Sequence, residues 1–165
     1  MMTEAEVLMT EEFRDYARRR ARAFLVHVKS TYLTVATIRS ELAEIDASFD
    51  GVRGVDYTRD SVASSHADEG LMRLIERRES LKSEYEAELL ENLQLQADAH
   101  RALRNVAEPA RSALTLHYLE GKTWTDVGEE MGYSLDHVKG RIAADGLVEL
   151  FRHIPREHIP DAYWD

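Results

Sequence analysis

Apolar residues recur at helical spacing along the first third of the chain. From Glu11 to about Ile45 no Pro or Gly interrupts the sequence. The apolar positions are three or four residues apart: Leu25, Val28, Tyr32, Val35, Ile38, Leu42 and Ile45. Such intervals place side chains on one face of an α-helix. We therefore predict one long amphipathic helix over residues 11–45.

A polar stretch, DASFDGVRGVDYTRDSVASSH, precedes a second apolar pattern. Its glycines and its Ser, Asp and Thr residues favour turns, so residues 46–66 are predicted to form a connection. A second long helix is expected from about Asp68 to about Val106, with an apolar stripe of Leu71, Leu74, Leu81, Tyr85, Leu89, Leu93 and Leu103. Two such helices can bury their stripes in an antiparallel hairpin or pair between two chains, and the spacing leaves both arrangements open.

After Pro109 the pattern changes to short helices separated by caps and glycines. Pro109 disfavours a helical residue before it and is accepted at the start of a new helix. Gly121 tolerates the positive φ with which that helix is expected to end. Thr123 and Asp126 then predict a capping box for a second helix over residues 124–131.

A third helix is predicted after a tight turn. Gly132 permits the turn, Ser134 can cap the new helix, and Gly128 suits a point where two crossing helices approach closely. Two capped helices three residues apart have the spacing of a helix-turn-helix. The angle between them is expected to be filled by Val127, Met131, Val138 and Ile142, and the third helix to return to the core through Leu147, Leu150 and Phe151.

The segment EGKTWTDVGEEMGYSLDHV resembles the helix-turn-helix of sigma-70 region 4, in which a small residue follows an aliphatic one and Ser or Thr caps the recognition helix. Gly128 and Ser134 occupy these positions. The chain as a whole resembles small phage regulators of the ArpU and RinA kind. This resemblance implies a transcriptional regulator of phage or prophage origin that binds promoter DNA. It is also compatible with a contact to RNA polymerase of the kind that region 4 makes.

The resemblance further implies that residues 134–141 enter the major groove. In physical terms, Asp136 can accept a hydrogen bond from cytosine N4, and Lys139 and Arg141 can donate to bases or phosphates. The candidate DNA-binding residues are Lys122, Thr123, Ser134, Asp136, His137, Lys139, Gly140 and Arg141.

These patterns together predict an all-α protein in which a long, coiled-coil-like antiparallel helical hairpin precedes a C-terminal helix-turn-helix domain. The predicted regions are 1–108 for the hairpin and oligomerisation, 109–154 for the helix-turn-helix and 155–165 for a tail. The expected partners are double-stranded DNA and, through the long helices, a second copy of the chain.

Composition narrows the functional classes. The sequence has 21 basic and 31 acidic side chains, a net charge of −10, so it is not expected to coat nucleic acid through electrostatics alone. It contains no Cys, which excludes disulfides and thiolate metal sites. The acidic start lacks the features of a signal peptide, and no run approaches the roughly 18 apolar residues of a membrane span. We expect a cytoplasmic protein without membrane association.

No catalytic site is predicted. The run Gly121, Lys122, Thr123 mimics the end of a phosphate loop, but Leu116 stands where that motif needs glycine. The pair His153 and His158 is interrupted by a proline and forms no helical metal pair. The sequence therefore predicts no enzyme activity, no cofactor and no metal site.

Three other features are interpreted without a catalytic role: the N-terminal arginine cluster, Trp124 and the C-terminal tail. The N-terminal cluster of Arg14, Arg18, Arg19, Arg20 and Arg22 is expected to form a solvated face with ion pairs rather than a phosphate grip. Trp124 is expected in the core. The tail HIPREHIPDAYWD is either a docking segment or packs against its own module.

Other protein classes remain open. A small terminase subunit, which packages phage DNA, also joins a helix-turn-helix to oligomerising helices, although that family usually places the DNA module first. A helical adaptor that binds only protein would suit the acidic charge. In that case the helix-turn-helix pattern would be a structural corner.

Overall fold

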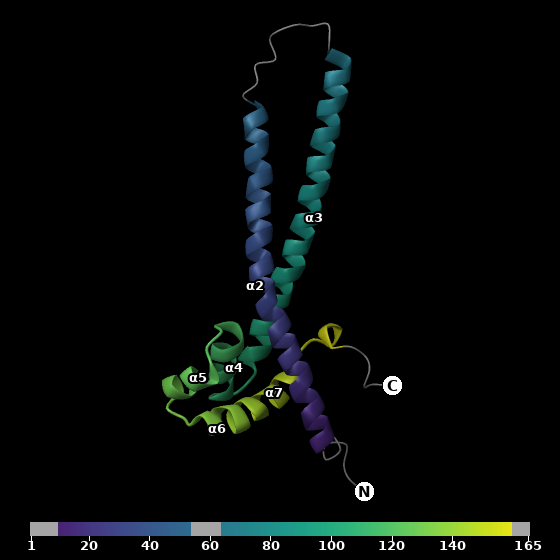
Figure 1. The fold of residues 1–165 in the computed structure, drawn as a ribbon. Helices are drawn as coiled ribbons and strands as arrows, with labels where there is room; N and C mark the ends of the chain where they lie inside the picture. Colours follow the sequence, from purple (N-terminus) through teal and green to yellow (C-terminus); the bar gives the residue numbers. More distant parts are fainter. Residues whose placement is uncertain (1–9, 54–63, 160–165) are drawn as a thin grey trace. The chain divides into compact units, whose positions relative to one another are not determined.

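The computed structural model describes residues 10–53 and 64–159, and side chains over 10–48 and 68–159. Every regular element in these ranges is helical, and none is a strand, which confirms the all-α prediction (Figure 1). The elements are α2 (Glu11–Arg53), α3 (Ser64–Arg104), α4 (Ala110–Leu114), η1 (Thr115–Leu119), α5 (Trp124–Met131), α6 (Leu135–His137), η2 (Val138–Ile142), α7 (Ala143–Phe151) and η3 (Arg156–His158).

The two long helices are longer than the sequence pattern predicts. Helix α2 continues through Gly51 to Arg53, and α3 already begins at Ser64. The prediction that all of residues 46–66 form a connection is therefore wrong at both ends; residues 54–63 lie outside the described residues. Extending an existing helix fixes one residue for each hydrogen bond gained, so weak helix formers are tolerated at its ends.

The chain divides into two compact units. The first unit comprises Met1–Thr31 and Gln94–Asp165, and the second comprises Tyr32–Leu93. Helices α2 and α3 each contribute to both units. The boundary predicted at Pro109 thus lies inside the first unit, because the start of α2 and the end of α3 pack with the C-terminal helices.

The first unit contains a continuous hydrophobic core. Its largest fully buried side chains include Leu25 from α2, Leu114 from α4, and Leu147 and Leu150 from α7. The Phe151 ring meets the rings of Phe13 and Tyr16 edge to face, at centroid distances of 5.8 and 5.7 Å. As predicted, Leu147, Leu150 and Phe151 return the C-terminal helix to the core. Burial of each such side chain contributes about 1.5–3 kcal/mol.

A smaller cluster fills the angle between α5 and the helix that follows it. Ala113, Val127 and Val138 are fully buried there. Partly buried side chains pack around them: Leu116, Trp124, Met131 and Ile142. This confirms the predicted contribution of Val127, Met131, Val138 and Ile142, and the core role expected of Trp124.

In the second unit the buried Val35 and Ile38 of α2 are accompanied by polar contacts between α2 and α3. The Asp46 carboxylate lies 3.0 Å from Arg78 and 3.4 Å from Lys82, and Glu41 on α2 is the main cause of the raised pKa of Tyr85 on α3. Residues later in α2 therefore lie beside residues earlier in α3, so the two helices are antiparallel in this unit. Of the predicted apolar stripes, Leu74 is 67% exposed and Leu81 is 39% exposed.

The described part of the tail packs against its own unit. Ile154 and Ile159 are buried. The His158 ring lies 5.6 Å from the Phe24 ring, and its Nε2 lies 3.1 Å from an Asp98 oxygen. For residues 155–159 packing is thus the correct alternative; residues 160–165, which carry Tyr163 and Trp164, lie outside the described residues.

Candidate nucleic-acid interface

Helix α5 begins with a complete capping box. The Thr123 hydroxyl accepts a hydrogen bond from the backbone N–H of Asp126, and the Asp126 carboxylate accepts one from the backbone N–H of Thr123. Both bonds satisfy N–H groups that a helix start leaves unpaired. The predicted box and the predicted bounds of this helix are confirmed, with Asp in the place usually held by Glu or Gln.

Three residues connect α5 to α6. Gly132 has a φ of +75°, the left-handed conformation that glycine adopts without steric cost. The Ser134 hydroxyl accepts a hydrogen bond from the backbone N–H of His137 and caps α6, as predicted. A Cβ on Gly128 would lie 2.8 Å from the backbone oxygen of Tyr133, so only glycine fits this crossing. The turn is thereby held against α5.

Helices α6, η2 and α7 follow one another without a break over residues 135–151, which we call the C-terminal helix (Figure 1). Val138 faces inward and is fully buried. A group of predicted site residues on its first turns is exposed: Asp136, His137, Lys139, Gly140 and Arg141. A Cβ on Gly140 would meet nothing within 4 Å, so the helix surface there is open to an approaching backbone.

Lys122 and Thr123 are engaged elsewhere. The Lys122 ammonium forms ion pairs with Glu130 and, at 3.7 Å, with Glu120. The hydrogen bond to Glu130 is the main cause of the raised pKa of Lys122. The Thr123 hydroxyl donates to the Asp126 carboxylate at 2.7 Å and accepts in the capping box. These two residues hold the start of α5 rather than present free groups.

The structure brings arginines of the N-terminal cluster to the C-terminal helix. Arg18, Arg22 and Lys139 line one cavity of about 270 Å³ within the first unit. The remaining lining residues are His117, Tyr118, Trp124, Ala143, Ala144 and Leu147. We call this space the cationic cavity. Its lining contains no acidic residue.

The predicted salt-bridged face is present on only part of the arginine cluster. Arg18 pairs with Asp15 at 2.9 Å and with Glu11 at 3.3 Å, and Arg14 pairs with Asp145 at 2.7 Å. Arg22 forms no ion pair with any side chain that the structure describes, and it was missed as a site residue. Its spacing of four residues from Arg18 places both on one helix face, but the spacing does not show that the C-terminal helices cover this face.

His117 reports the local electrostatics. Its Nδ1 donates to the Lys122 carbonyl oxygen at 2.7 Å, and its ring stacks on Trp124 at 3.8 Å. Burial lowers its pKa, and the positive charges of Lys29, Arg22 and Lys139 lower it further, against the opposing effect of the hydrogen bond. The cavity is therefore locally positive in a chain of net charge −10.

One group of side chains has the composition of a metal site. Ligand atoms of Asp98, Glu157 and His158 lie within 4.8 Å of one another. The buried Asp98 carboxylate, however, already accepts hydrogen bonds from Gln94 and Arg101, each at 3.1 Å, and contacts His158. These partners account for the cluster as a tie between the tail and α3.

Comparison with known proteins gives no relative: no family model, no curated protein and no solved structure matches the chain. Among the helices of the described ranges, none combines the length and apolar character that a bilayer crossing requires.

Proposed function

We propose that the protein is a DNA-binding transcriptional regulator that reads a promoter through the exposed face of its C-terminal helix. The observation that carries this proposal is the geometry around the turn. Two capped helices are locked by Gly128, and the second presents Asp136, His137, Lys139 and Arg141 to solvent. This is the arrangement in which a recognition helix offers side chains to base edges. The phage or prophage origin rests on the resemblance to region-4-like regulators alone.

The distribution of charge also supports the proposed DNA binding. The whole chain is acidic, but Lys139 and Arg141 form no ion pair with a residue in the described ranges. Arg22 and Lys29 lie near enough to His117 to influence its pKa together with Lys139. A DNA contact needs such a local excess of positive charge, since affinity depends on neutralised phosphates.

Binding selection from a random duplex library tests the proposal with the full chain. Arg141→Ala should weaken binding to the selected site by about 1–3 kcal/mol, with relaxed specificity at one position if the contact is to a base. A phosphate contact should instead give a uniform loss and a salt slope reduced by about one. Arg73→Ala removes the same charge from the second unit and serves as the control.

The opposite result would identify another class. If Lys139→Ala and Arg141→Ala both remain folded and bind the selected DNA like the unaltered chain, the two helices form a structural corner. A protein-only adaptor would then be the better function. A binding map in cells, with and without RNA polymerase inhibition, separates a promoter site from a packaging site.

We also propose that the second unit mediates pairing with a second copy of the chain. Leu33, Leu74 and Leu90 are 75%, 67% and 68% exposed there. A contiguous exposed apolar patch marks a partner surface, and we propose that these three leucines belong to one. Sedimentation should show an association that Leu33→Gln with Leu90→Gln weakens. A single monomeric species at every concentration would contradict it.

A further inference from the structure

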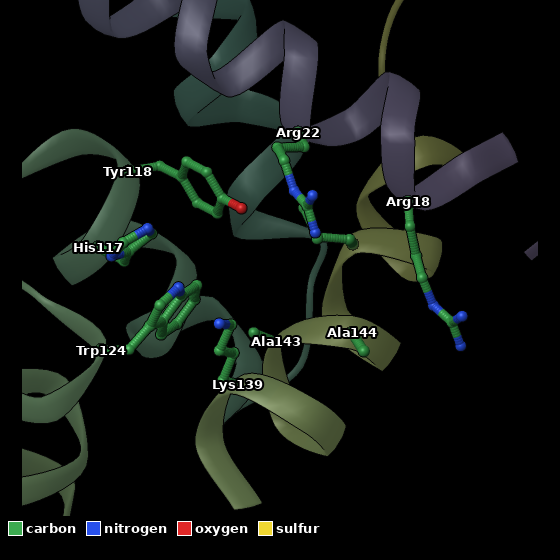
Figure 2. Close-up of a pocket in the computed structure, with 9 residues that line it drawn as sticks. Arg18, Arg22, His117, Tyr118, Trp124, Lys139, Ala143 and Ala144 are labelled. Carbon is green, nitrogen blue, oxygen red and sulfur yellow. The ribbon is translucent and has the colours of Figure 1, made fainter. Parts of the chain in front are cut away.

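Two basic side chains that line the cationic cavity, Arg22 and Lys139, form no ion pair with a described side chain. Figure 2 shows the Arg22 guanidinium and the Lys139 ammonium reaching into the space beside Tyr118 and Trp124, whereas the Arg18 guanidinium turns away. Arg18 is already paired with acidic residues. Arg22 and Lys139 form no ion pair with a residue whose side chain is described, so two positive charges share one space without a counter-charge.

A hydroxyl group completes the set of donors. Tyr118 is only 7% exposed, and its hydroxyl points toward Arg22 (Figure 2). This hydroxyl makes no hydrogen bond to any residue within the described ranges. A phenol hydroxyl can both donate and accept a hydrogen bond, so this one is available to a molecule in the cavity.

Two uncommon backbone segments border the same cavity. Residues Thr115–Leu119 and Val138–Ile142 are π-helical, and they carry His117, Tyr118 and Lys139. The wider turn is visible in the bonds from the backbone N–H of Glu120 to the carbonyl of Thr115 and from that of Ala143 to Val138. Isolated π-turns within helices occur frequently at functional sites.

The chemistry of the lining limits the ligand. Two convergent cations with a phenol hydroxyl match a group that is multiply charged and rich in acceptor oxygens, and guanidinium groups bind phosphate in this way. The cavity lining has no carboxylate that would repel such a group. A volume of about 270 Å³ accommodates a phosphate with part of the molecule that carries it.

We propose that the cationic cavity is a phosphate-binding site in which Arg22, Lys139 and the Tyr118 hydroxyl hold the phosphate oxygens. The phosphate belongs either to the DNA backbone beside the C-terminal helix or to a free phosphorylated molecule. The first source rests on the proposed function, and the second is independent of it. Arg22 distinguishes this site from base reading, because it lies on α2 and outside the C-terminal helix.

Tryptophan fluorescence provides a direct test with the full chain. The sequence has two tryptophans, and Trp164→Phe leaves Trp124, which lines the cavity, as the only reporter. Titration with inorganic phosphate at constant ionic strength should give a saturable signal. Arg22→Ala should weaken it about tenfold or more, since a charged hydrogen bond contributes about one to two decades. Tyr118→Phe keeps the ring and should weaken it severalfold.

The control variant is Arg104→Ala, which removes an equal charge from an exposed position of the first unit that does not line the cavity. It should leave the titration unchanged. If duplex DNA displaces phosphate, and Arg22→Ala lowers the salt slope of DNA binding by about one, the source is the DNA backbone. If phosphate and DNA bind together, the source is a free phosphorylated molecule.

Failure of this proposal differs from failure of the proposed function. Saturable phosphate binding without any DNA binding supports the phosphate site and removes the DNA-reading function. DNA binding that is insensitive to Arg22→Ala, together with a phosphate titration that this variant does not change, overturns the phosphate site and leaves the function intact.

Discussion

The two units of this protein use the same pair of helices in different ways. In the first unit α2 and α3 pack with the C-terminal helices around a continuous core. In the second unit Val35 and Ile38 are the only buried apolar side chains of the same helices, among those that the structure describes. Helical periodicity is present in both regions. It indicates a helix in each case, but the larger core forms where the C-terminal helices also cover the stripe.

This contrast assigns stability and association to different regions. Unfolding the first unit exposes many buried apolar side chains, which costs about 25 cal/mol for each Å². The second unit has fewer to expose, and its ion pairs lie near solvent. We therefore expect the first unit to set the free energy of unfolding.

The largest predicted effect tests this assignment directly. Leu114→Ala, at a fully buried position of the first unit, should lower the free energy of unfolding by about 2–5 kcal/mol. Leu74→Ala, at a position 67% exposed in the second unit, should change it by no more than about 0.5 kcal/mol. Urea titration of both variants measures the difference. Equal losses would show that the second unit has a core comparable to the first.

A pair of glycine variants sharpens the comparison within the first unit. Gly128→Ala places a methyl group 2.8 Å from the Tyr133 backbone oxygen and should cost about 1–3 kcal/mol. Gly140→Ala adds its methyl group in open space on the C-terminal helix and should stabilise by about 0.5–1 kcal/mol. Thermal unfolding distinguishes them. Destabilisation by both variants would mean that backbone flexibility rather than close contact accounts for Gly128.

The helix caps should contribute less. Thr123→Ala and Ser134→Ala each remove a hydroxyl that accepts a backbone hydrogen bond, and each should cost about 1 kcal/mol. Thr125 is exposed in the first turn of α5 and is not its N-cap residue, so Thr125→Ala should be neutral. Chemical denaturation provides the values. A loss at Thr125 as large as at Thr123 would contradict a specific capping contribution.

His117 should give the first unit a dependence on pH. Its pKa lies below the unfolded value near 6.5, chiefly because of burial. The unfolded chain therefore binds more protons in the interval below 6.5. The stability that His117 contributes is fully present above pH 6.5. It is lost as the pH falls through the pKa of His117 in the folded protein. His117→Asn should remove this part of the pH dependence between pH 7 and 5. An unchanged profile would show that the residue does not titrate differently on unfolding.

The smallest effect is expected in the second unit. Asp46→Asn removes the ion pairs to Arg78 and Lys82, which lie near solvent, and should cost less than about 1 kcal/mol. The loss should shrink further in high salt, because exposed charges are screened. Denaturation at two salt concentrations measures it. A loss of several kcal/mol would make these ion pairs, rather than apolar contacts, the main support of the second unit.

The local features of the fold could be predicted from the sequence. The capping box at Thr123 and Asp126, the turn at Gly132 and the cap at Ser134 each depend on residues a few positions apart. Such contacts are encoded in short segments. The approach of Gly128 to the turn was predictable for the same reason.

The composition of the cationic cavity could not be predicted. Arg22 and Lys139 are far apart along the chain, and the spacing of arginines on α2 does not show which face the C-terminal helix covers. The ends of the long helices also differ from the prediction, since continuity of an existing helix outweighs the turn preference of Gly51.

The π-helical turns affect how this chain would align with a homologue. A π-turn accommodates one residue more than an α-turn, so it behaves as a single-residue insertion inside a helix. Each residue of an α-helix advances the direction of its side chain by about 100°. A relative that lacks the extra residue in Val138–Ile142 would align with a one-residue gap, and its equivalent of Lys139 would be rotated away relative to Leu147 and Leu150. The length of this short segment, more than the identity of its residues, would then distinguish relatives that retain the cavity from those that retain only the fold.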